Sequence, residues 1–188
     1  MENIVLASAS PRRKELLEKM GLKFSIIPSN CEEKLSDNIY SDEKIENLAL
    51  NKAKNVVQKV QTPSIIIAAD TVVVLDNIIL GKPKDKKDAF NMIKSLSGKT
   101  HFVVTAIAII DSETKKTKVT NTKTFVTFTE LKDDEIQKYV NLDEPYDKAG
   151  AYAAQGYASI FIEKIEGCFN NVVGISTFTL NKMLKEFI

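Results

Sequence analysis

The most restrictive feature of the chain is an uninterrupted apolar run, Ile65-Ile66-Ile67-Ala68-Ala69, rich in β-branched side chains. An apolar run without polar alternation is typical of a central strand that is covered on both faces. Val72-Val73-Val74-Leu75 continues this strand, and Asp76-Asn77 followed by Ile78-Ile79-Leu80 predicts a tight turn and the returning arm of a hairpin. The run therefore predicts a sheet with helices packed on both of its faces.

Asp70 interrupts this apolar stretch. A carboxylate at such a point is either exposed where the strand leaves the core or buried beside polar partners. Carboxylates at strand ends in α/β sheets often carry the chemistry of a site. The alternative is an aspartate bonded to nearby backbone in a turn, and the sequence leaves both interpretations open.

The N-terminal residues predict a strand, a tight turn and the start of a helix. Residues 3–7 form a short run suited to a buried strand, Ser10 is a favoured N-cap, and Pro11 suits the first helical position. Arg12 and Arg13 then place two cations in the first turn, opposite to the charge that the helix dipole favours. Such a helix start suits a polyanion such as phosphate, and a solvated basic patch is the alternative.

Two lysines lie at positions where the sequence pattern limits what their side chains can contact. Lys52 falls on the apolar stripe of a predicted helix, one turn after Leu48 and one turn before Val56. A lysine on a core-facing stripe either snorkels to solvent or meets an anion, and both remain open here. Lys82 lies in the short, stiff loop Gly81-Lys82-Pro83, where glycine lets the backbone approach a ligand closely.

The other segments complete an α/β pattern. They predict helices over 42–60, 85–96 and 133–140, strands over 23–27 and 158–163, a long antiparallel hairpin of 101–110 with 118–129, and a closing amphipathic helix over 180–187. Strands alternate with helices early in the chain, and the long hairpin follows. Together, these helices and strands predict a single domain of residues 1–188 with a mixed sheet.

Composition excludes several classes of function. The chain has 188 residues and a net charge of +1, so no global field recruits nucleic acid or a membrane, and no apolar run approaches a membrane span of roughly 20 residues. The N-terminus lacks the pattern of a signal peptide, and Cys31 and Cys168 form no metal or redox motif, so we expect free thiols in the cytoplasm. His101 is the only histidine, which argues against a histidine triad or zinc site and favours a packed or capping role.

The charged residues singled out by position suit phosphate chemistry. The candidate cations are Arg12 with Arg13, Lys52, Lys82 and Lys148. The candidate oxygen ligands are Asp70 and Glu33, although a loop glutamate such as Glu33 is more often simply solvated. This set suits hydrolysis of a phosphoanhydride by a water that a carboxylate orients or deprotonates, with a metal on the phosphate oxygens, and it also suits plain nucleotide binding. The Walker A and GxGxxG spacings are absent.

Six segments, in this order and spanning nearly the whole chain, resemble motifs of the Maf family. They are Leu6-Ala7-Ser8-Ala9-Ser10-Pro11-Arg12-Arg13-Lys14-Glu15-Leu16-Leu17, Ala69-Asp70-Thr71-Val72-Val73, Gly81-Lys82-Pro83, Leu96-Ser97-Gly98-Lys99-Thr100-His101, Asp147-Lys148-Ala149-Gly150-Ala151-Tyr152 and Gln155-Gly156. Several motifs in series are far more specific than any one of them. The resemblance implies a nucleoside triphosphate pyrophosphatase that needs a divalent metal (Mg²⁺ or Mn²⁺). It also implies a fold like that of inosine triphosphate pyrophosphatases, an elongated mixed sheet flanked by helices, with two lobes and a central cleft.

The resemblance also implies roles for individual residues. Asp70 would be the general base, with Asp70 and Glu33 near the metal. The residues expected around the triphosphate and metal are Ser8, Arg12, Arg13, Glu33, Lys52 and Lys82. Arg12, Thr71 and Gln155 occupy the positions that distinguish subgroups, and here they resemble the subgroup acting on dTTP and UTP. The amide of Gln155 can pair with the donor and acceptor edge of uracil or thymine.

Two alternative functions remain at this point. One is the same reaction on 7-methyl-GTP, against which Thr71 and Gln155 argue. The other is a non-catalytic, nucleotide-sensing regulator, because Maf proteins are associated with septum formation and cell-division arrest. The resemblance allows a homodimer.

Overall fold

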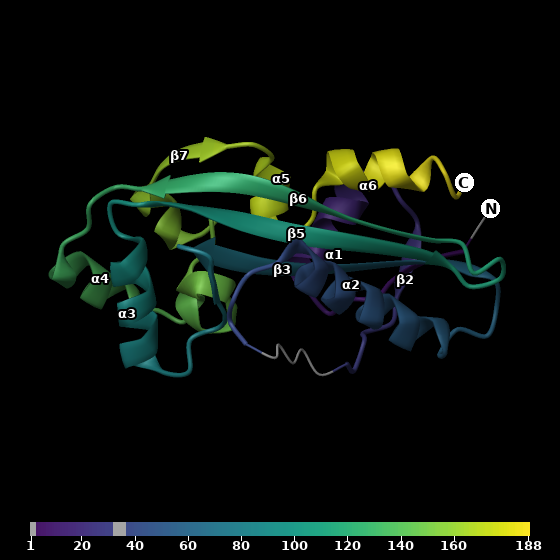
Figure 1. The fold of residues 1–188 in the computed structure, drawn as a ribbon, viewed down its shortest axis with the longest axis horizontal. Coiled ribbons are helices and arrows are strands. Elements are labelled where there is room, and N and C mark those ends of the chain that lie inside the picture. Colours follow the sequence, from purple (N-terminus) through teal and green to yellow (C-terminus); the bar gives the residue numbers. More distant parts are fainter. Residues whose placement is uncertain (1–2, 32–36) are drawn as a thin grey trace.

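The computed structural model describes residues 3–31 and 37–188, and an elongated mixed sheet runs the length of the molecule (Figure 1). The sheet has seven strands in the order β2-β1-β3-β5-β6-β7, with β4 paired to β3. The strands are β1 (Asn3–Leu6), β2 (Phe24–Ile26), β3 (Ser64–Leu75), β4 (Ile78–Leu80), β5 (Thr100–Asp111), β6 (Thr117–Phe128) and β7 (Ile162–Glu166). A mixed sheet flanked by helices confirms the predicted fold class.

The helices of the described residues vary in length and type. The α-helices are α1 (Pro11–Lys19), α2 (Asp42–Val57), α3 (Lys86–Leu96), α4 (Asp133–Tyr139), α5 (Phe169–Val173) and α6 (Thr177–Leu184). Three short 3₁₀ helices follow α4, namely η1 (Glu144–Asp147), η2 (Ala149–Ala151) and η3 (Tyr157–Phe161). Within the described ranges, no helix combines the length and the apolar character that crossing a membrane requires.

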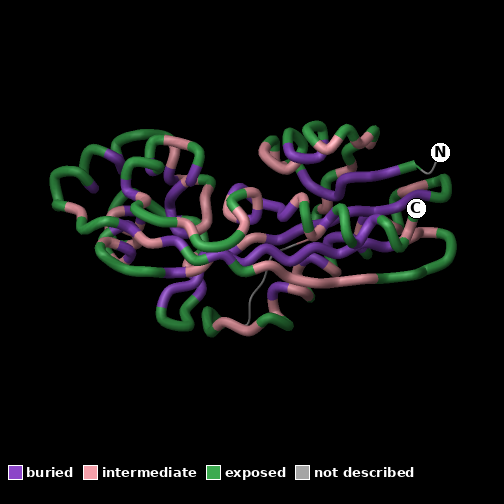
Figure 2. The backbone as a smooth tube through the Cα atoms, turned by 90° about the horizontal axis from the view of Figure 1, so that it is seen from above, coloured by how far each residue is buried: buried purple, intermediate pink, exposed green. Residues whose placement is uncertain are grey.

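Strand β3 is the central strand that its apolar run predicts. Side chains alternate along it, so Ile66 and Ala68 pack against α2 on one face, while Ile65 and Ile67 pack in the cluster of α1 and α6 on the other. Further along, Val73 joins a third cluster with α3, α4 and the 3₁₀ helices at the opposite end of the sheet (Figure 1). Buried residues follow the strands, and exposed residues lie in the peripheral segments (Figure 2).

One edge of β3 changes partners. The parallel strand β1 pairs with it up to Leu6↔Ile67, and the antiparallel strand β4 pairs with it from Val73↔Leu80 onward. Strand β5 occupies the opposite edge continuously from Ile65 to Val74. Among the described strands, none pairs with residues 68–72 on the first edge, so the sheet has a gap at Asp70 and Thr71.

The predicted hairpin turn is confirmed. Asp76 and Asn77 both have positive φ angles, 49° and 66°, as a two-residue hairpin turn requires. Ser41 and Asp85 cap their helices by accepting the backbone N–H of the residue three positions on. The long hairpin is also confirmed, as β5 paired with β6.

The strand predicted over 158–163 is wrong for most of its length. Residues 157–161 form η3, and β7 begins only at Ile162. Glu144 accepts hydrogen bonds from the backbone N–H groups of Tyr157 and Ala158, which caps a helical turn. The apolar residues of this segment therefore pack from a 3₁₀ helix, and the first N–H groups of that helix bond to Glu144, which is distant in sequence. The short helix α5 was not predicted.

His101 is packed in the core, as the sequence favoured. It is 2% exposed, and its Nε2 lies 2.7 Å from the hydroxyl of Tyr152. Its Nδ1 is buried and has no hydrogen-bond partner among the described residues. Burial lowers the pKa of His101 to about 4 because the protonated ring would lose its hydration.

Because the pKa is near 6.5 in the unfolded chain, His101 makes stability depend on pH. The unfolded state binds the proton first, so the free energy of unfolding should fall by up to about 3 kcal/mol as the pH drops from 6.5 to 4. Above pH 6.5 this contribution is constant. Urea unfolding should show a steeper fall of stability over this pH range in wild type than in His101→Gln, which lacks the titrating ring. Equal slopes in both proteins would contradict the assignment.

Candidate active site

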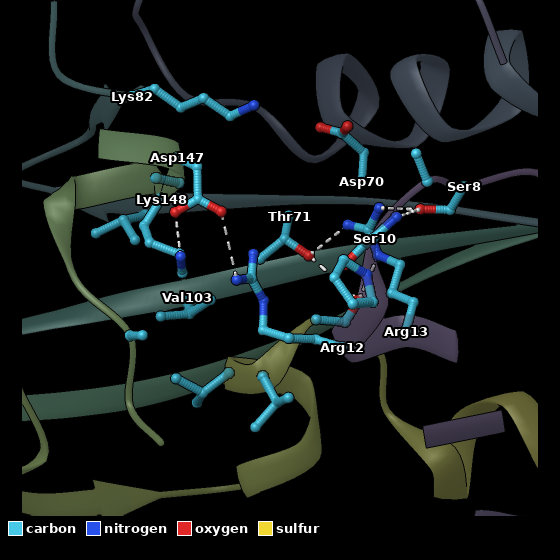
Figure 3. Close-up of a pocket in the computed structure, with 18 of the residues that line it drawn as sticks. Ser8, Ser10, Arg12, Arg13, Asp70, Thr71, Lys82, Val103, Asp147 and Lys148 are labelled. Atoms are coloured by element: carbon cyan, nitrogen blue, oxygen red, sulfur yellow. Dashed lines mark hydrogen bonds and ion pairs between the residues drawn. The ribbon is translucent and has the colours of Figure 1, made fainter. Parts of the chain in front are cut away.

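A pocket of about 400 Å³ lies at the gap in the sheet. Its walls come from the β1–α1 turn, β3, the loop after β4, and the segment from η1 to Gln155 (Figure 3). The pocket brings together all the predicted site residues that the structure describes, namely Ser8, Arg12, Arg13, Lys52, Asp70, Thr71, Lys82 and Gln155. Glu33 lies outside the described residues.

The β1–α1 turn forms the strand, turn and helix start that the sequence predicts. Ser10 is at the N-cap and Pro11 opens α1, but the Ser10 side chain makes no capping hydrogen bond. Instead the hydroxyl of Ser8 accepts the backbone N–H of Ser10, at 3.2 Å, and also accepts from Arg13 Nη1, at 3.2 Å. Ser8 therefore shapes the turn and ties it to the cation that follows.

Arg13 is fixed by groups from three parts of the chain. Besides Ser8, its Nε donates to the carbonyl of Gly174 at 2.9 Å, and its Nη2 donates to the Thr71 hydroxyl at 3.0 Å (Figure 3). These bonds join α1 to β3 and to the turn after α5. A guanidinium held in this way is a preorganised positive group for phosphate oxygens.

A buried polar chain that sequence analysis missed supports this arrangement. Thr71 contacts the Thr105 hydroxyl at 2.8 Å, and Thr105 donates to the carbonyl of Asn171 at 3.0 Å. The side chain of Asn171 donates to the Val103 carbonyl at 3.1 Å. Thr105 and Asn171 are fully buried, so these bonds fix α5 against β5. The available signal was a threonine inside the apolar run of β5.

Lys52 and Asp70 form a buried ion pair. Lys52 is 7% exposed and Asp70 is 5% exposed, and the ammonium of Lys52 hydrogen-bonds to Asp70 Oδ1. The lysine on the apolar stripe of α2 therefore meets an anion, and the aspartate is buried beside a polar partner. Alternation along β3 directs Asp70 to the α2 face and Thr71 to the α1 face, so the pocket draws on both faces of the sheet.

Arg12 points in a different direction from Arg13 (Figure 3). Its Nη1 lies 3.8 Å from Asp147 Oδ2, and Asp147 also pairs with Lys148. Although partial burial acts to raise it, the pKa of Asp147 is lowered overall by the hydrogen bond and charge of Lys148 and by the charge of Arg12. The sequence indicates Lys148 as a candidate cation but indicates no role for Asp147.

The Lys82 loop is attached to η2. The backbone N–H of Gly150 donates to the carbonyl of Gly81 at 2.9 Å. Gly150 has a φ of +66°, and a Cβ there would lie 2.9 Å from Val73 Cγ2, so glycine suits this position in both backbone and space. Lys82 extends from the loop across the pocket toward Asp70 (Figure 3).

The donor set fits a hard divalent cation. Asp70 lines the pocket with a carboxylate, the ligand type that Mg²⁺ and Mn²⁺ prefer, whereas the Ser8 hydroxyl already accepts two N–H donors. Within the described residues, no three His, Cys, Asp or Glu side chains gather as a metal site. Such a cation therefore fits if phosphate oxygens and water complete its coordination, as is usual for Mg²⁺.

Sequence comparison matches this chain to the family of Maf-like proteins over residues 3–187. Among similar proteins, a dTTP/UTP pyrophosphatase of Ruminiclostridium cellulolyticum is 49% identical over 99% of this chain and 96% of its own. A dTTP/UTP pyrophosphatase of Clostridium beijerinckii is 47% identical over 97% of this chain and 98% of its own.

Comparison with solved structures confirms the expected fold. The Ham1 protein of Staphylococcus aureus aligns over the whole of both chains with a TM-score of 0.53 at 13% identity. A nucleoside-triphosphatase / dITP/XTP pyrophosphatase of Mycobacterium abscessus aligns over 98% of this chain and 93% of its own, with a TM-score of 0.50 at 16% identity.

The buried ion pair should make Lys52 important for stability. Lys52→Met removes the ammonium beside Asp70, and we expect the free energy of unfolding to fall by about 3 kcal/mol in urea. Adding Asp70→Asn should recover part of that loss, because no buried carboxylate is then left beside an apolar side chain. Lys54→Met, at an exposed position of the same helix, is the matched control. A double variant no more stable than Lys52→Met would contradict this view.

Proposed function

The chain belongs to the Maf-like protein family, and from this we propose that it is a nucleoside triphosphate pyrophosphatase that converts dTTP and UTP to the monophosphate and pyrophosphate. Relatives close to half identical over nearly the full length carry that activity in their names. The observation that carries the proposal is one pocket that joins the Asp70–Lys52 pair to the fixed cation Arg13.

Asp70 acts as the general base in this proposal. Its carboxylate takes a proton from water as the water oxygen bonds to the α-phosphorus, and the bond from that phosphorus to the bridging oxygen breaks. The leaving pyrophosphate carries away the electron pair of that bond. Lys52 holds the carboxylate in position by their hydrogen bond, and Arg13 and Lys82 stabilise negative charge on the phosphate oxygens.

A divalent cation would be held by Asp70, with Glu33 as its second ligand, and it would neutralise charge on the phosphate oxygens as a Lewis acid. The support for this is the oxygen donor set at Asp70 and the general need of phosphoanhydride hydrolysis for charge neutralisation. Ser8 takes part by fixing Arg13 at the same end of the pocket.

In this proposal the base of the nucleotide contacts Arg12 and Gln155, which both line the pocket. Thr71 occupies the third subgroup position, and its hydroxyl is engaged by Arg13 and Thr105. Thr71 therefore acts on the site through the placement of Arg13. On the family resemblance we further propose one domain over residues 1–188, a cytoplasmic location and a homodimer.

A nucleotide panel tests the function. With Mg²⁺ or Mn²⁺, the pure protein should release pyrophosphate from UTP and dTTP faster than from CTP, GTP or 7-methyl-GTP. Asp70→Asn should lower kcat by about 10²–10⁴-fold. Asp76→Asn, an exposed aspartate at the end of the same strand, is the matched control. Absence of pyrophosphate release, or equal activity of Asp70→Asn, would overturn the proposal. Preference for 7-methyl-GTP would favour the other subgroup.

The non-catalytic alternative has a separate test. If the protein is a nucleotide-sensing regulator of cell division, Asp70→Asn should reproduce its cellular effect in full. If the effect depends on catalysis, Asp70→Asn should fail to reproduce it while Asp76→Asn succeeds.

A further inference from the structure

The short 3₁₀ helix η1 carries two acidic residues, of which Asp147 contacts Arg12 and Glu144 contacts the backbone just after Gln155. Glu144, its first residue, contacts the segment that bears Gln155. Asp147, its last residue, contacts Arg12. Arg12 and Gln155 come from opposite ends of the sequence, so η1 is the element that touches both sides.

Glu144 fixes the chain immediately after Gln155. Its Oε2 accepts the backbone N–H of Tyr157 at 2.7 Å, and its Oε1 accepts the backbone N–H of Ala158 at 3.2 Å. The hydroxyl of Tyr139 lies 3.0 Å from Oε1 as well. Three donors on one carboxylate are a strong local anchor, because hydrogen bonds to a charged acceptor are roughly twice as strong as neutral ones.

Gly156 shows how closely this carboxylate approaches the chain. A Cβ on Gly156 would lie 2.1 Å from Glu144 Oε2, so the space that a side chain would need is filled by the glutamate. The Gln155-Gly156 pair of the sequence therefore has a physical reason. Glycine leaves room for the Glu144 carboxylate, and the hydrogen bonds of that carboxylate fix the backbone just after Gln155.

Asp147 gives Arg12 its direction. Figure 3 shows Asp147 between Lys148 and Arg12, while Arg13 points toward Ser8 and Thr71. Two consecutive arginines of one helical turn are thus divided between the two ends of the pocket. Arg13 is held at the end that contains Asp70 and Lys52, and Arg12 is held toward η1.

The chemistry of the bases shows why this division matters. A glutamine amide can turn over, so it pairs equally well with the acceptor and donor edge of uracil or with the reversed edge of cytosine. An arginine has only donors, so it donates to a carbonyl oxygen of uracil and opposes the amino group of cytosine. Rejection of cytosine therefore depends on a guanidinium that is held beside the base.

We propose that Asp147 and Glu144 are positioning residues for base selection, with Asp147 directing Arg12 toward the base and Glu144 fixing the backbone of Gln155. This inference rests on the proposed function. It goes further in assigning the exclusion of cytosine nucleotides to the two carboxylates of η1.

Substitution of Asp147 tests whether this residue directs Arg12 toward the base. The ratio of kcat/KM for UTP to kcat/KM for CTP should fall at least about threefold in Asp147→Ala, and Asp147→Asn should give an intermediate ratio. The expected change is modest because an exposed ion pair is weak, although it still orients the Arg12 side chain. The kcat on UTP should change by less than about twofold, because Asp70, Lys52 and Arg13 are untouched. Asp143→Asn, an exposed neighbour just before η1, is the control and should keep the wild-type ratio.

Substitution at the contact between Glu144 and Gly156 tests whether Glu144 fixes the backbone of Gln155. Gly156→Ala places a methyl group against the carboxylate, and Glu144→Gln replaces one accepting oxygen by a donor, so each should lower the same ratio by about tenfold. A thermal unfolding midpoint near that of wild type shows that a variant has folded. Asp147 is exposed, so its variants should fold even if those at Glu144 do not.

The dissociation constants of UTP and CTP, measured in EDTA, separate this inference from the proposed function. If wild type fails to hydrolyse either nucleotide, the proposed function fails, and the ratio of dissociation constants still reports base selection. A ratio lowered in Asp147→Ala and unchanged in Asp143→Asn supports the inference. A wild-type ratio in Asp147→Ala, or wild-type binding without preference for UTP, overturns it.

Discussion

Strand β3 pairs with β5 continuously from Ile65 to Val74 on one edge. On the other edge its pairing with β1 ends at Ile67 and its pairing with β4 begins at Val73, which leaves residues 68–72 unpaired by the described strands. This interval lies in the middle of the sheet, so its polar groups are surrounded by core. Alternation of side chains directs Asp70 to the α2 face and Thr71 to the α1 face. Groups from both faces can meet a single ligand only where the sheet is open, so the pocket depends on this gap.

The buried ion pair between Lys52 and Asp70 carries a desolvation penalty. Burying Lys52 and Asp70 removes two charges from water, and a buried pair of this kind adds little net stability compared with apolar residues of similar size. Its value is therefore better explained by chemistry than by stability. Arg13 is held in place by hydrogen bonds to hydroxyl and carbonyl oxygens from three parts of the chain.

The sequence predicts what depends on neighbours along the chain. The buried strand, the Asp76-Asn77 turn and the start of α1 follow from local patterns, and all three are confirmed. The eight described site residues were identified mainly because the family resemblance collected them in one place. Contacts over long separations were not predictable, and Glu144 shows why. Its carboxylate accepts the first two backbone N–H groups of the 3₁₀ helix at residues 157–161, but nothing within that segment signals this contact.

In the proposed mechanism, water activated at Asp70 attacks the α-phosphorus of a pyrimidine nucleoside triphosphate in this pocket. Hydrolysis of UTP in water enriched in ¹⁸O, followed by mass spectrometry of both products, tests the site of attack directly. Attack at the α-phosphorus should place one ¹⁸O atom in the nucleoside monophosphate and none in pyrophosphate. Label in pyrophosphate, or release of labelled inorganic phosphate as the first product, would contradict it.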